Sequence, residues 1–550
     1  MLKVQLSKSL EKIISEFAKN KGIDEKIKWT IEIPPKNIDA DFALNAAMTI
    51  AKKIKKNPKD IALEMIDIII KEMPDFVNKA FIAGAGFINL CLKDDVFTKQ
   101  LKEILLKKDK YASLTENKQE KILIEFVSAN PTGPLHIGHG RGAAIGDSLA
   151  RIYKHLGYDV KKEYYLNDAG NQMMILGQST KIRYKQQKGE KIDFPENHYQ
   201  GDYIVDIADR LIKEGRNVDE IDFTAESVKD ILKTIEDDLK SFGVEFDTWF
   251  SESELAVKKD KDGKTQVDKA CEYLKEKGDA YINEEALWLA STKFGDDKDR
   301  VLKRSDGRYT YLASDVSYHK NKFDRGFNKL IDLWGADHHG YVARIKAVVE
   351  MLGYDKDDLE LILYQLVSLT RNGQPVAMST RTGEFISLKE VIDEVGKDAC
   401  RFFFLLRAPD SQLDFDIDLA KKQSSENPVF YVQYVNARCN SIVKESLKRN
   451  DLVKDPDLSL LSSKEERDLM KKLTAFCDTL LICEKTMSPH HFTAYLMELA
   501  DLYHKFYEKC RVLSEDCALT SARLELIKAV MIIIETGLGL LGVSAPKRMD

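Results

Sequence analysis

Two histidines lie in a segment where a strand is expected to pass into a helix. The segment 129–142 reads ANPTGPLHIGHGRG and places His136 and His139 three residues apart, directly after a predicted strand at 121–127. The N-terminus of a helix exposes backbone N–H groups and favours phosphates. Imidazoles held there can donate hydrogen bonds to ATP as charge builds during displacement at its α-phosphorus. Gly138 would let the nucleotide lie close to the backbone, so the pattern predicts phosphate chemistry at this turn.

Three further side chains suit a flat cation with several hydrogen-bond donors. Glu125 interrupts the apolar strand just before the histidines, and a buried carboxylate needs a partner to remain charged. Tyr311 and Asp315 are four residues apart in a helix-like stretch, so they share a face. Two carboxylates and a phenol match the guanidinium group of arginine. The alternative is that each side chain only satisfies a neighbouring backbone group or lysine, which is the common case for acidic residues.

A second histidine-containing string, GADHHG at 335–340, follows a predicted strand at 329–334. Asp337 beside two histidines suggests a metal site. Adjacent ligands on one short turn rarely converge, however, and no fourth ligand is evident. We therefore expect no protein-bound metal.

Three regions must position these residues. Residues 1–116 contain amphipathic helical stretches and then a strand, which predicts a small α+β domain. Residues 117–423 repeat the order strand, helix, strand at both ends and predict a parallel sheet, with a charged, mainly helical insertion at about 175–303. Residues 424–550 predict a helical bundle. The expected fold class is therefore multidomain α/β.

The individual elements follow from the spacing of apolar residues. Strands are expected at 87–92, 121–127, 160–165, 329–334 and 361–367. Helices are expected at 40–55, 58–73, 138–156, 224–242, 341–352, 428–448, 464–485, 490–510 and 521–541.

The composition is typical of a globular protein with several domains. The chain has 550 residues, of which 43% are hydrophobic and 32% charged, so it can build more than one core. A net charge of -6 neither implies nor excludes a nucleic-acid partner. The N-terminus lacks the apolar run of a signal peptide, the run at 529–534 is too short to span a bilayer, and eight cysteines include no CxxC pair. We expect no membrane association and a reducing, cytoplasmic location.

The histidine segment resembles a known family. His136 to His139 spell the HIGH signature of class I aminoacyl-tRNA synthetases, and 128–144 closely resembles the form carried by bacterial arginyl-tRNA synthetases. The likeness extends to YLNDAGNQ at 165–172, WGADHHG at 334–340, NPVFYVQY at 427–434 and the closing PKRM. It implies a Rossmann catalytic domain, an N-terminal domain that touches the tRNA elbow and a C-terminal anticodon-binding bundle. The implied reaction activates L-arginine with ATP, as its Mg²⁺ complex, and transfers it to the 3′ end of tRNA(Arg), releasing AMP and diphosphate.

The resemblance also implies roles for single residues. His136 and His139 are the implied catalytic residues, with Gly138, Gly335, Asp337 and His338 at ATP. The implied arginine contacts are Glu125, Tyr311 and Asp315 at the guanidinium and Ser128 and Asn130 at the backbone end. The implied tRNA contacts are Phe87 and Asn89 at the D-loop and Tyr431, Arg438 and Met549 at the anticodon domain.

One motif departs from the family pattern. The second class I signature, KMSKS, uses lysines to stabilise the triphosphate, yet the aligned residues 377–381 read AMSTR and lack both lysines. Met378 and Ser379 keep their positions at ATP, and Arg381 is the nearest replacement for the lost charge, with Arg371 and Arg141 as possible helpers.

Two alternatives remain open at this point. A class I synthetase for another amino acid would share the HIGH segment but has no need for an acidic pocket. A non-enzymatic tRNA-binding relative would explain the missing lysines but has no need for an amino-acid pocket. We expect an enzyme that works as a monomer without an obligate protein partner.

Overall fold

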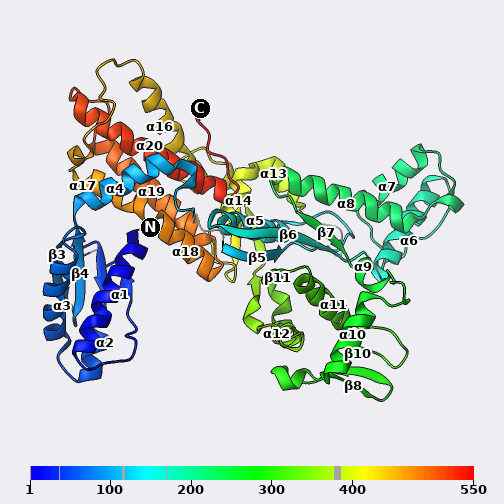
Figure 1. Ribbon diagram of the computed structural model, residues 1–550. Coiled ribbons are helices and arrows are strands. Elements are labelled where there is room, and N and C mark those ends of the chain that lie inside the picture. Colours follow the sequence, from blue (N-terminus) through cyan, green and yellow to red (C-terminus); the bar gives the residue numbers. More distant parts are fainter. Residues whose placement is uncertain (1, 36, 114–117, 169, 377–385, 550) are drawn as a thin grey trace.

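The centre of the molecule is a five-stranded parallel sheet (Figure 1). The computed structural model describes residues 2–35, 37–113, 118–168, 170–376 and 386–549. Across the sheet the strands follow the order β12 (Leu359–Tyr364), β11 (Lys329–Gly335), β5 (Lys118–Glu125), β6 (Tyr158–Leu166) and β7 (Thr248–Ser251). All four neighbouring pairs are parallel. The predicted multidomain α/β fold with a parallel sheet is confirmed.

The strand order reverses between β5 and β11. The chain enters at β5, builds outward through β6 to β7, and then returns to the other side of β5 with β11 and β12. Ligands of such open sheets bind beyond the carboxyl ends of the strands at this reversal. The HIGH segment follows β5 and GADHHG follows β11, so both predicted ATP segments lie at the reversal point.

Helix α5 (Ile137–His155) covers the sheet closely because glycines face its neighbours. A Cβ atom on Gly146 would lie 2.3 Å from the ring of Phe126, and one on Gly140 would lie 2.5 Å from Leu388. Beneath the helix, Ile122 and Ile124 of β5 are fully buried. The close approach fixes the start of α5, and with it the two histidines, relative to the sheet.

The segment predicted as one insertion at about 175–303 differs from the structure, because β7 lies inside it. An arm of α6 (Asn171–Gln187), α7 (Asp202–Lys213) and α8 (Phe223–Ser241) precedes β7 (Figure 1). After β7 come α9 (Ser253–Ala256), α10 (Gln266–Lys277) and an antiparallel sheet of β8 (Ala280–Asn283), β9 (Ala286–Leu289) and β10 (Arg300–Lys303). A strand of four residues in a charged region carries too little periodicity to be recognised from sequence.

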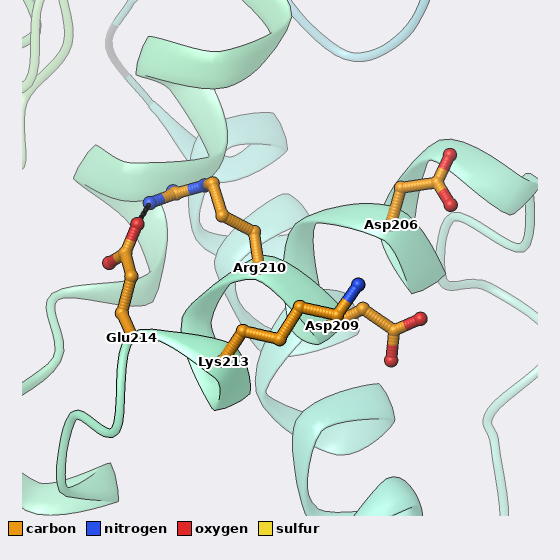
Figure 2. Close-up of a pocket in the computed structure, with 5 residues that line it drawn as sticks. All are labelled: Asp206, Asp209, Arg210, Lys213 and Glu214. Carbon is orange, nitrogen blue, oxygen red and sulfur yellow. Dashed lines mark hydrogen bonds and ion pairs between the residues drawn. The ribbon is translucent and has the colours of Figure 1, made fainter.

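A shallow hollow on α7 is lined by charged side chains (Figure 2): Asp206, Asp209, Arg210, Lys213 and Glu214. Arg210 forms ion pairs with Glu214 of its own helix and with Glu226 and Asp230 of α8, at 2.6 to 2.9 Å. These charges join two helices of the arm. The hollow therefore lies away from the carboxyl edge of the sheet, where the predicted site residues gather.

The N-terminal region combines helices with a small antiparallel sheet. Its helices are α1 (Leu2–Asn20), α2 (Ala46–Ile54) and α3 (Pro58–Glu72), and its sheet has the order β1 (Ile31–Glu32), β2 (Phe42–Leu44), β4 (Phe87–Leu92) and β3 (Val77–Ala83). The next helix, α4 (Asp94–Lys107), leaves this region and packs on the C-terminal bundle (Figure 1). Arg467 of the bundle pairs with Asp94 at 2.7 Å and with the buried Asp41 at 3.1 Å, which ties the two regions together.

The C-terminal bundle contains α16 (Pro428–Ser446), α17 (Lys464–Thr474), α18 (Phe476–Thr486), α19 (His490–Lys509) and α20 (Cys517–Leu540). The helix predicted at 464–485 is two helices that meet at Ala475. Between the sheet and the bundle lie α13 (Leu388–Val395), α14 (Lys397–Phe404), α15 (Ile417–Lys421) and the strands β13 (Val367–Arg371), β14 (Gln374–Pro375) and β15 (Leu413–Asp416). A search of the described residues finds no helix with the length and apolar character to cross a membrane.

Two charges buried under α5 join the catalytic region to the bundle. Asp147 and Arg401 are both fully buried and lie 2.7 Å apart. Arg401 also donates to the backbone carbonyl of Leu541, just after α20. The surrounding cations, Arg401 first, outweigh burial and lower the pKa of Asp147 to about 2. The carboxylate therefore stays ionised and holds α5, α14 and the end of the bundle in one arrangement.

Candidate active site

His136 caps α5 with its own ring. Its Nδ1 accepts the N–H of Gly138 at 3.1 Å, and the Nδ1 of His139 accepts the N–H of His136 at 3.3 Å. The rings stack, with 3.7 Å between centroids and 22° between planes. Because each Nδ1 is an acceptor, each proton is on Nε2. The turn therefore presents two N–H donors, one above the other.

Both imidazoles are neutral. Burial lowers the pKa of His136, and burial together with the neighbouring His136 lowers the pKa of His139 to about 3. Neutral donors at a helix N-terminus can bind phosphate oxygens without a fixed positive charge. The structure adds a second explanation for glycine at position 138. A Cβ atom there would lie 3.0 Å from the His136 ring and would crowd it.

The chain between β5 and the histidines makes a strained turn. Val127 and Ser128 have φ angles of 70° and 41°, which is rare for a residue other than glycine and unusual for a β-branched one. The Ser128 hydroxyl donates to Glu125 Oε1 at 2.9 Å and accepts the Tyr165 N–H at 3.2 Å. The exposed Asn130 donates to Gln172 at 2.9 Å, so the predicted YLNDAGNQ segment lies beside this turn.

Glu125 is already paired. Its second oxygen accepts a hydrogen bond of 2.6 Å from Lys322, which is fully buried on α11 (Tyr311–Asp324). Lys322 also contacts both oxygens of Asp332 on β11, at 2.8 and 2.9 Å. A lysine partner is the alternative that the sequence left open for Glu125. The structure thus places Glu125 next to the predicted pocket but with both oxygens engaged.

Asp315 and Glu252 are carboxylates without a cation. Asp315 is half-buried on α11 and accepts a hydrogen bond from Tyr341, and burial raises its pKa. Glu252 follows β7, is 8% exposed, and has a pKa raised by burial and by the charges of Asp315 and Asp168. Within the described part of the chain, neither carboxylate forms an ion pair with a Lys, Arg or His side chain. Tyr311 lies one turn before Asp315 and is 81% exposed.

These carboxylates lie near the hydroxyl group of Tyr165, on β6. Burial raises the pKa of Tyr165, and the charges of Glu252, Asp315, Glu125 and Asp168 raise it further. Carboxylates from four separate segments thus act on one phenol at the carboxyl edge of the sheet. Neither Glu252 nor Asp168 was predicted from the sequence as a pocket residue. A carboxylate directly after a recognised β7 would have been the signal for Glu252.

GADHHG forms a short turn, Ala336–Tyr341, at the end of β11. A Cβ atom on Gly335 would lie 2.5 Å from Asp337 Oδ1, so a larger residue there would displace the Asp337 carboxylate. The Asp337 and His338 side chains are 80% and 60% exposed and lie 3.6 Å apart. They are free to meet a nucleotide beside the HIGH turn. The described residues include no group of three or more His, Cys, Asp or Glu side chains placed to hold a metal ion.

Met378, Ser379 and Arg381 lie outside the described residues. Further along, the N–H of Leu388 donates to the Leu135 carbonyl at 2.7 Å, next to the histidines. The two proposed helpers are engaged elsewhere: Arg141 is fully buried and donates to the carbonyls of Gln365 and Ala408, and Arg371 pairs with Glu394.

The predicted tRNA residues differ in accessibility. Tyr431 and Arg438 lie half-buried along α16, and their side chains pack on His504 and Tyr507 of α19. Met549 is half-buried in the C-terminal tail, and Phe87 is half-buried at the start of β4. Asn89 differs from these residues. It lies in the middle of β4, between β2 and β3, and is fully buried, and its role at the D-loop stays a prediction.

Comparison with known proteins gives matches along the chain. Residues 2–92 match the arginyl tRNA synthetase N terminal domain, 100–404 the catalytic domain of tRNA synthetases class I (R), and 432–549 the DALR anticodon binding domain. An arginine–tRNA ligase of Citrifermentans bemidjiense is 49% identical over 540 residues, covering 94% of this chain and 96% of the relative. One of Geobacter sp. is 48% identical over 536 residues, with coverage of 94% and 96%.

Solved structures agree with these relatives. A putative arginyl-tRNA synthetase from Campylobacter jejuni superposes with a TM-score of 0.75 at 37% identity, covering 83% of this chain and 100% of that one. The Thermus thermophilus arginyl-tRNA synthetase has a TM-score of 0.78 at 23% identity, with both chains fully covered, and supports the fold. The neutral histidine pair, the acidic pocket and the three matched domains lead to one conclusion: the chain belongs to the arginyl-tRNA synthetase family of class I aminoacyl-tRNA synthetases.

Proposed function

We propose that this chain activates L-arginine with ATP and transfers it to the 3′ end of tRNA(Arg), and that the histidine pair and the acidic pocket share the work. The observation that carries the proposal is their placement. Two neutral N–H donors after β5 and a group of carboxylates from β6, β7 and α11 lie at the same edge of the sheet. A nucleotide bound along the β5 and β11 ends would therefore meet an amino acid bound over the carboxylates.

The histidines act on the phosphates of ATP. In the first step the carboxylate of arginine attacks the α-phosphorus, and diphosphate leaves with the bonding electrons. Negative charge grows on the phosphate oxygens during this displacement. The Nε2–H groups of His136 and His139 donate to those oxygens, and their fixed stacking means that little reorganisation is needed as the charge grows. Gly335, Asp337 and His338 hold the ribose and adenine from the β11 side.

Asp315 and Glu252 recognise the guanidinium. Among the described residues neither carboxylate forms an ion pair, so both are open to a cation, and arginine is the amino acid whose side chain is a planar cation with several donors. Tyr311 lies over the same helix face, and Ser128 and Asn130 bind the backbone end of the substrate. Lysine carries a compact charge without the planar, forked set of donors that guanidinium offers to carboxylates, so the pocket favours arginine over it.

Several finer assignments belong to the same proposal. Arg381 replaces the missing lysines at the triphosphate, with Met378 and Ser379 beside it, and Mg²⁺ arrives bound to ATP. Phe87 faces the tRNA elbow, whereas Tyr431, Arg438 and Met549 face the anticodon arm. Aromatic and arginine side chains suit unpaired loop bases. The enzyme works as a monomer in the cytoplasm.

A charging assay tests the proposal. Purified protein is incubated with total tRNA, ATP and each labelled amino acid in turn, and acid-insoluble label is counted. We expect label from arginine alone, and only with ATP present. Charging with a different amino acid would overturn the pocket assignment. Binding of tRNA without any charging would favour the non-enzymatic alternative.

A further inference from the structure

Lys322 is a fully buried ammonium with three carboxylate oxygens around it. It lies 2.6 Å from Glu125 Oε2 and 2.8 and 2.9 Å from the two oxygens of Asp332. These partners come from α11, β5 and β11, so the cluster crosses the point where the strand order reverses. A buried charge of this kind is tolerated because its partners neutralise it, and loss of one partner leaves an uncompensated charge.

The pair affects the ionisation of both members. Burial lowers the pKa of Lys322, but the charges of Asp332, Glu125 and Glu163 outweigh burial and raise it. Burial raises the pKa of Glu125, and the charge of Lys322 opposes that rise. Lys322 therefore stays protonated and favours the ionised form of Glu125.

Glu125 also contacts the turn that borders the predicted arginine pocket. Its other oxygen accepts the Ser128 hydroxyl at 2.9 Å, and that hydroxyl accepts the Tyr165 N–H at 3.2 Å. Ser128 and Val127 have positive φ angles, a conformation that persists only when its surroundings hold it. Glu125 therefore stabilises the conformation of this turn.

The charge of the guanidinium is recognised by carboxylates other than Glu125. Asp315 and Glu252 form no ion pair with a described cation, whereas Glu125 already shares the Lys322 ammonium with Asp332. A carboxylate that already holds a buried ammonium adds little net attraction for a guanidinium.

We infer that Glu125 and Lys322 form a positioning pair beneath the arginine pocket: Lys322 holds one oxygen of Glu125 in an ion pair, and the other oxygen of Glu125 fixes the Ser128 hydroxyl and its turn, so Glu125 supplies geometry where Asp315 and Glu252 supply charge. The inference rests on the proposed function, because it assigns roles within the arginine pocket.

Glutamine at position 125 separates geometry from charge. Glu125→Gln keeps the size, and the amide can accept from Lys322 while donating to Ser128, and Lys322 keeps Asp332 as its counterion. We expect the KM for arginine to rise by no more than about threefold, the scale of one altered neutral hydrogen bond. Asp315→Asn, the reference variant, should raise it at least about tenfold. If Glu125 binds the guanidinium by charge, the two variants will have similar KM values.

In the Lys322→Met variant, the direction in which the KM for arginine changes with pH distinguishes a positioning role of Glu125 from direct binding of the guanidinium. Without the ammonium, the pKa of Glu125 rises, and at higher pH an unpaired carboxylate forms under the turn. At pH 8.5 we expect the KM of this variant for arginine to exceed the wild-type value by at least about tenfold. At pH 6.5 we expect the KM of the same variant to be lower than its value at pH 8.5. A direct guanidinium ligand would show the opposite trend, because ionised Glu125, freed from Lys322, would bind arginine better as pH rises.

The double variant Glu125→Gln with Lys322→Met removes both charges. It should recover part of the arginine affinity lost in Lys322→Met and reduce its pH dependence, a coupling that only interacting residues show, while Asp332 lacks its ammonium equally in both variants. Lys320→Met is the matched control: Lys320 lies on the same helix, pairs with Asp324 at the surface and should leave the KM for arginine at the wild-type value. The charged and titratable groups that face the pair are the same in all variants: Asp332, His319, Tyr318, Glu163, Arg325, Asp315 and Tyr165.

The outcomes are separable. If Asp315→Asn leaves the KM for arginine unchanged, the arginine pocket of the proposed function fails. If Asp315→Asn acts as expected but Glu125→Gln is equally damaging, or the double variant shows no recovery, the positioning pair is refuted. Thermal unfolding checks each variant. Should Lys322→Met fail to fold, the comparison of Glu125→Gln with Asp315→Asn decides the question by itself.

Discussion

Replacing His139 with alanine removes an uncharged hydrogen-bond donor and part of a helix cap, and the two losses can be measured separately. His139 stacks on His136 and accepts its backbone N–H. Loss of a donor aimed at charge that develops in the transition state costs up to about 3–4 kcal/mol, or about a thousandfold in rate. We expect adenylate formation to slow by at least about tenfold, and His136→Ala to act similarly.

Loss of the helix cap should lower the free energy of unfolding. The Nδ1 of His139 accepts one N–H at 3.3 Å, so the alanine variant should unfold with about 0.5–1 kcal/mol less free energy. A rate loss of tenfold or more then exceeds what the cap explains. His155→Ala is the matched control, because His155 lies at the other end of α5, where it contacts the Tyr111 carbonyl at 2.9 Å and the ring of Phe476. It should lower stability without a specific loss of adenylate formation.

The pH dependence follows from the neutral state of the ring. The pKa of His139 is about 3 in the folded protein and 6.5 for the free side chain, so the unfolded chain binds more protons between these values. Stability from this residue is therefore present above pH 6.5 and is lost as pH falls toward 3. Between pH 6.5 and 8.5 the wild-type rate should show no step from this ring, whereas a catalytic imidazolium would give a rate that falls as pH rises through about 6.5.

The assay is ATP–pyrophosphate exchange with arginine and tRNA present, run beside chemical unfolding and tRNA binding. Near-normal exchange in both His136→Ala and His139→Ala would refute the assignment. A rate loss matched by an equal loss of tRNA affinity would also contradict it, since the histidines are placed to act on ATP.

Three further changes test other parts of the molecule. Asp315→Asn should raise the KM for arginine at least about tenfold while changing the KM for ATP far less, and equal KM values for arginine in initial-rate assays would contradict the pocket. Arg381→Ala should slow adenylate formation by about tenfold or more, whereas Thr380→Lys should be neutral or beneficial, and a silent Arg381→Ala variant would place the compensating charge elsewhere. Asp147→Asn should lower the unfolding free energy by about 3–5 kcal/mol because it leaves Arg401 buried without its carboxylate, and a loss below about 1 kcal/mol in denaturant titration would show that the pair is dispensable.

The elements around the histidines could be predicted because their causes are local. An apolar run ending at Val127 reads as a buried strand, and a turn rich in glycine and proline followed by helical spacing reads as the start of a helix. The structure places β5 and α5 within a few residues of these expectations. The position of HIGH and GADHHG at the reversal point also follows, because the order of strands and helices constrains how a parallel sheet can be built.

The features that the sequence did not reveal share one cause, which is a weak local signal. β7 has four residues inside a charged region, so neither the strand nor Glu252 behind it could be recognised. Asn89 reads as an ordinary strand residue, and only the neighbouring strands β2 and β3 decide that it is covered.

What only the tertiary structure decided is which charges meet. The sequence by itself determined that a carboxylate at 125 would need a partner, because an isolated ion in an apolar strand is too costly. It could not name Lys322, which lies 197 residues further along the chain. Nor could it show that, among the residues the structure describes, Glu125 would form an ion pair while Asp315 and Glu252 would not. Local spacing sets which face of a helix or strand a side chain occupies, but electrostatic pairing depends on distances in space, and those exist only once the sheet has brought β5, β11 and α11 together.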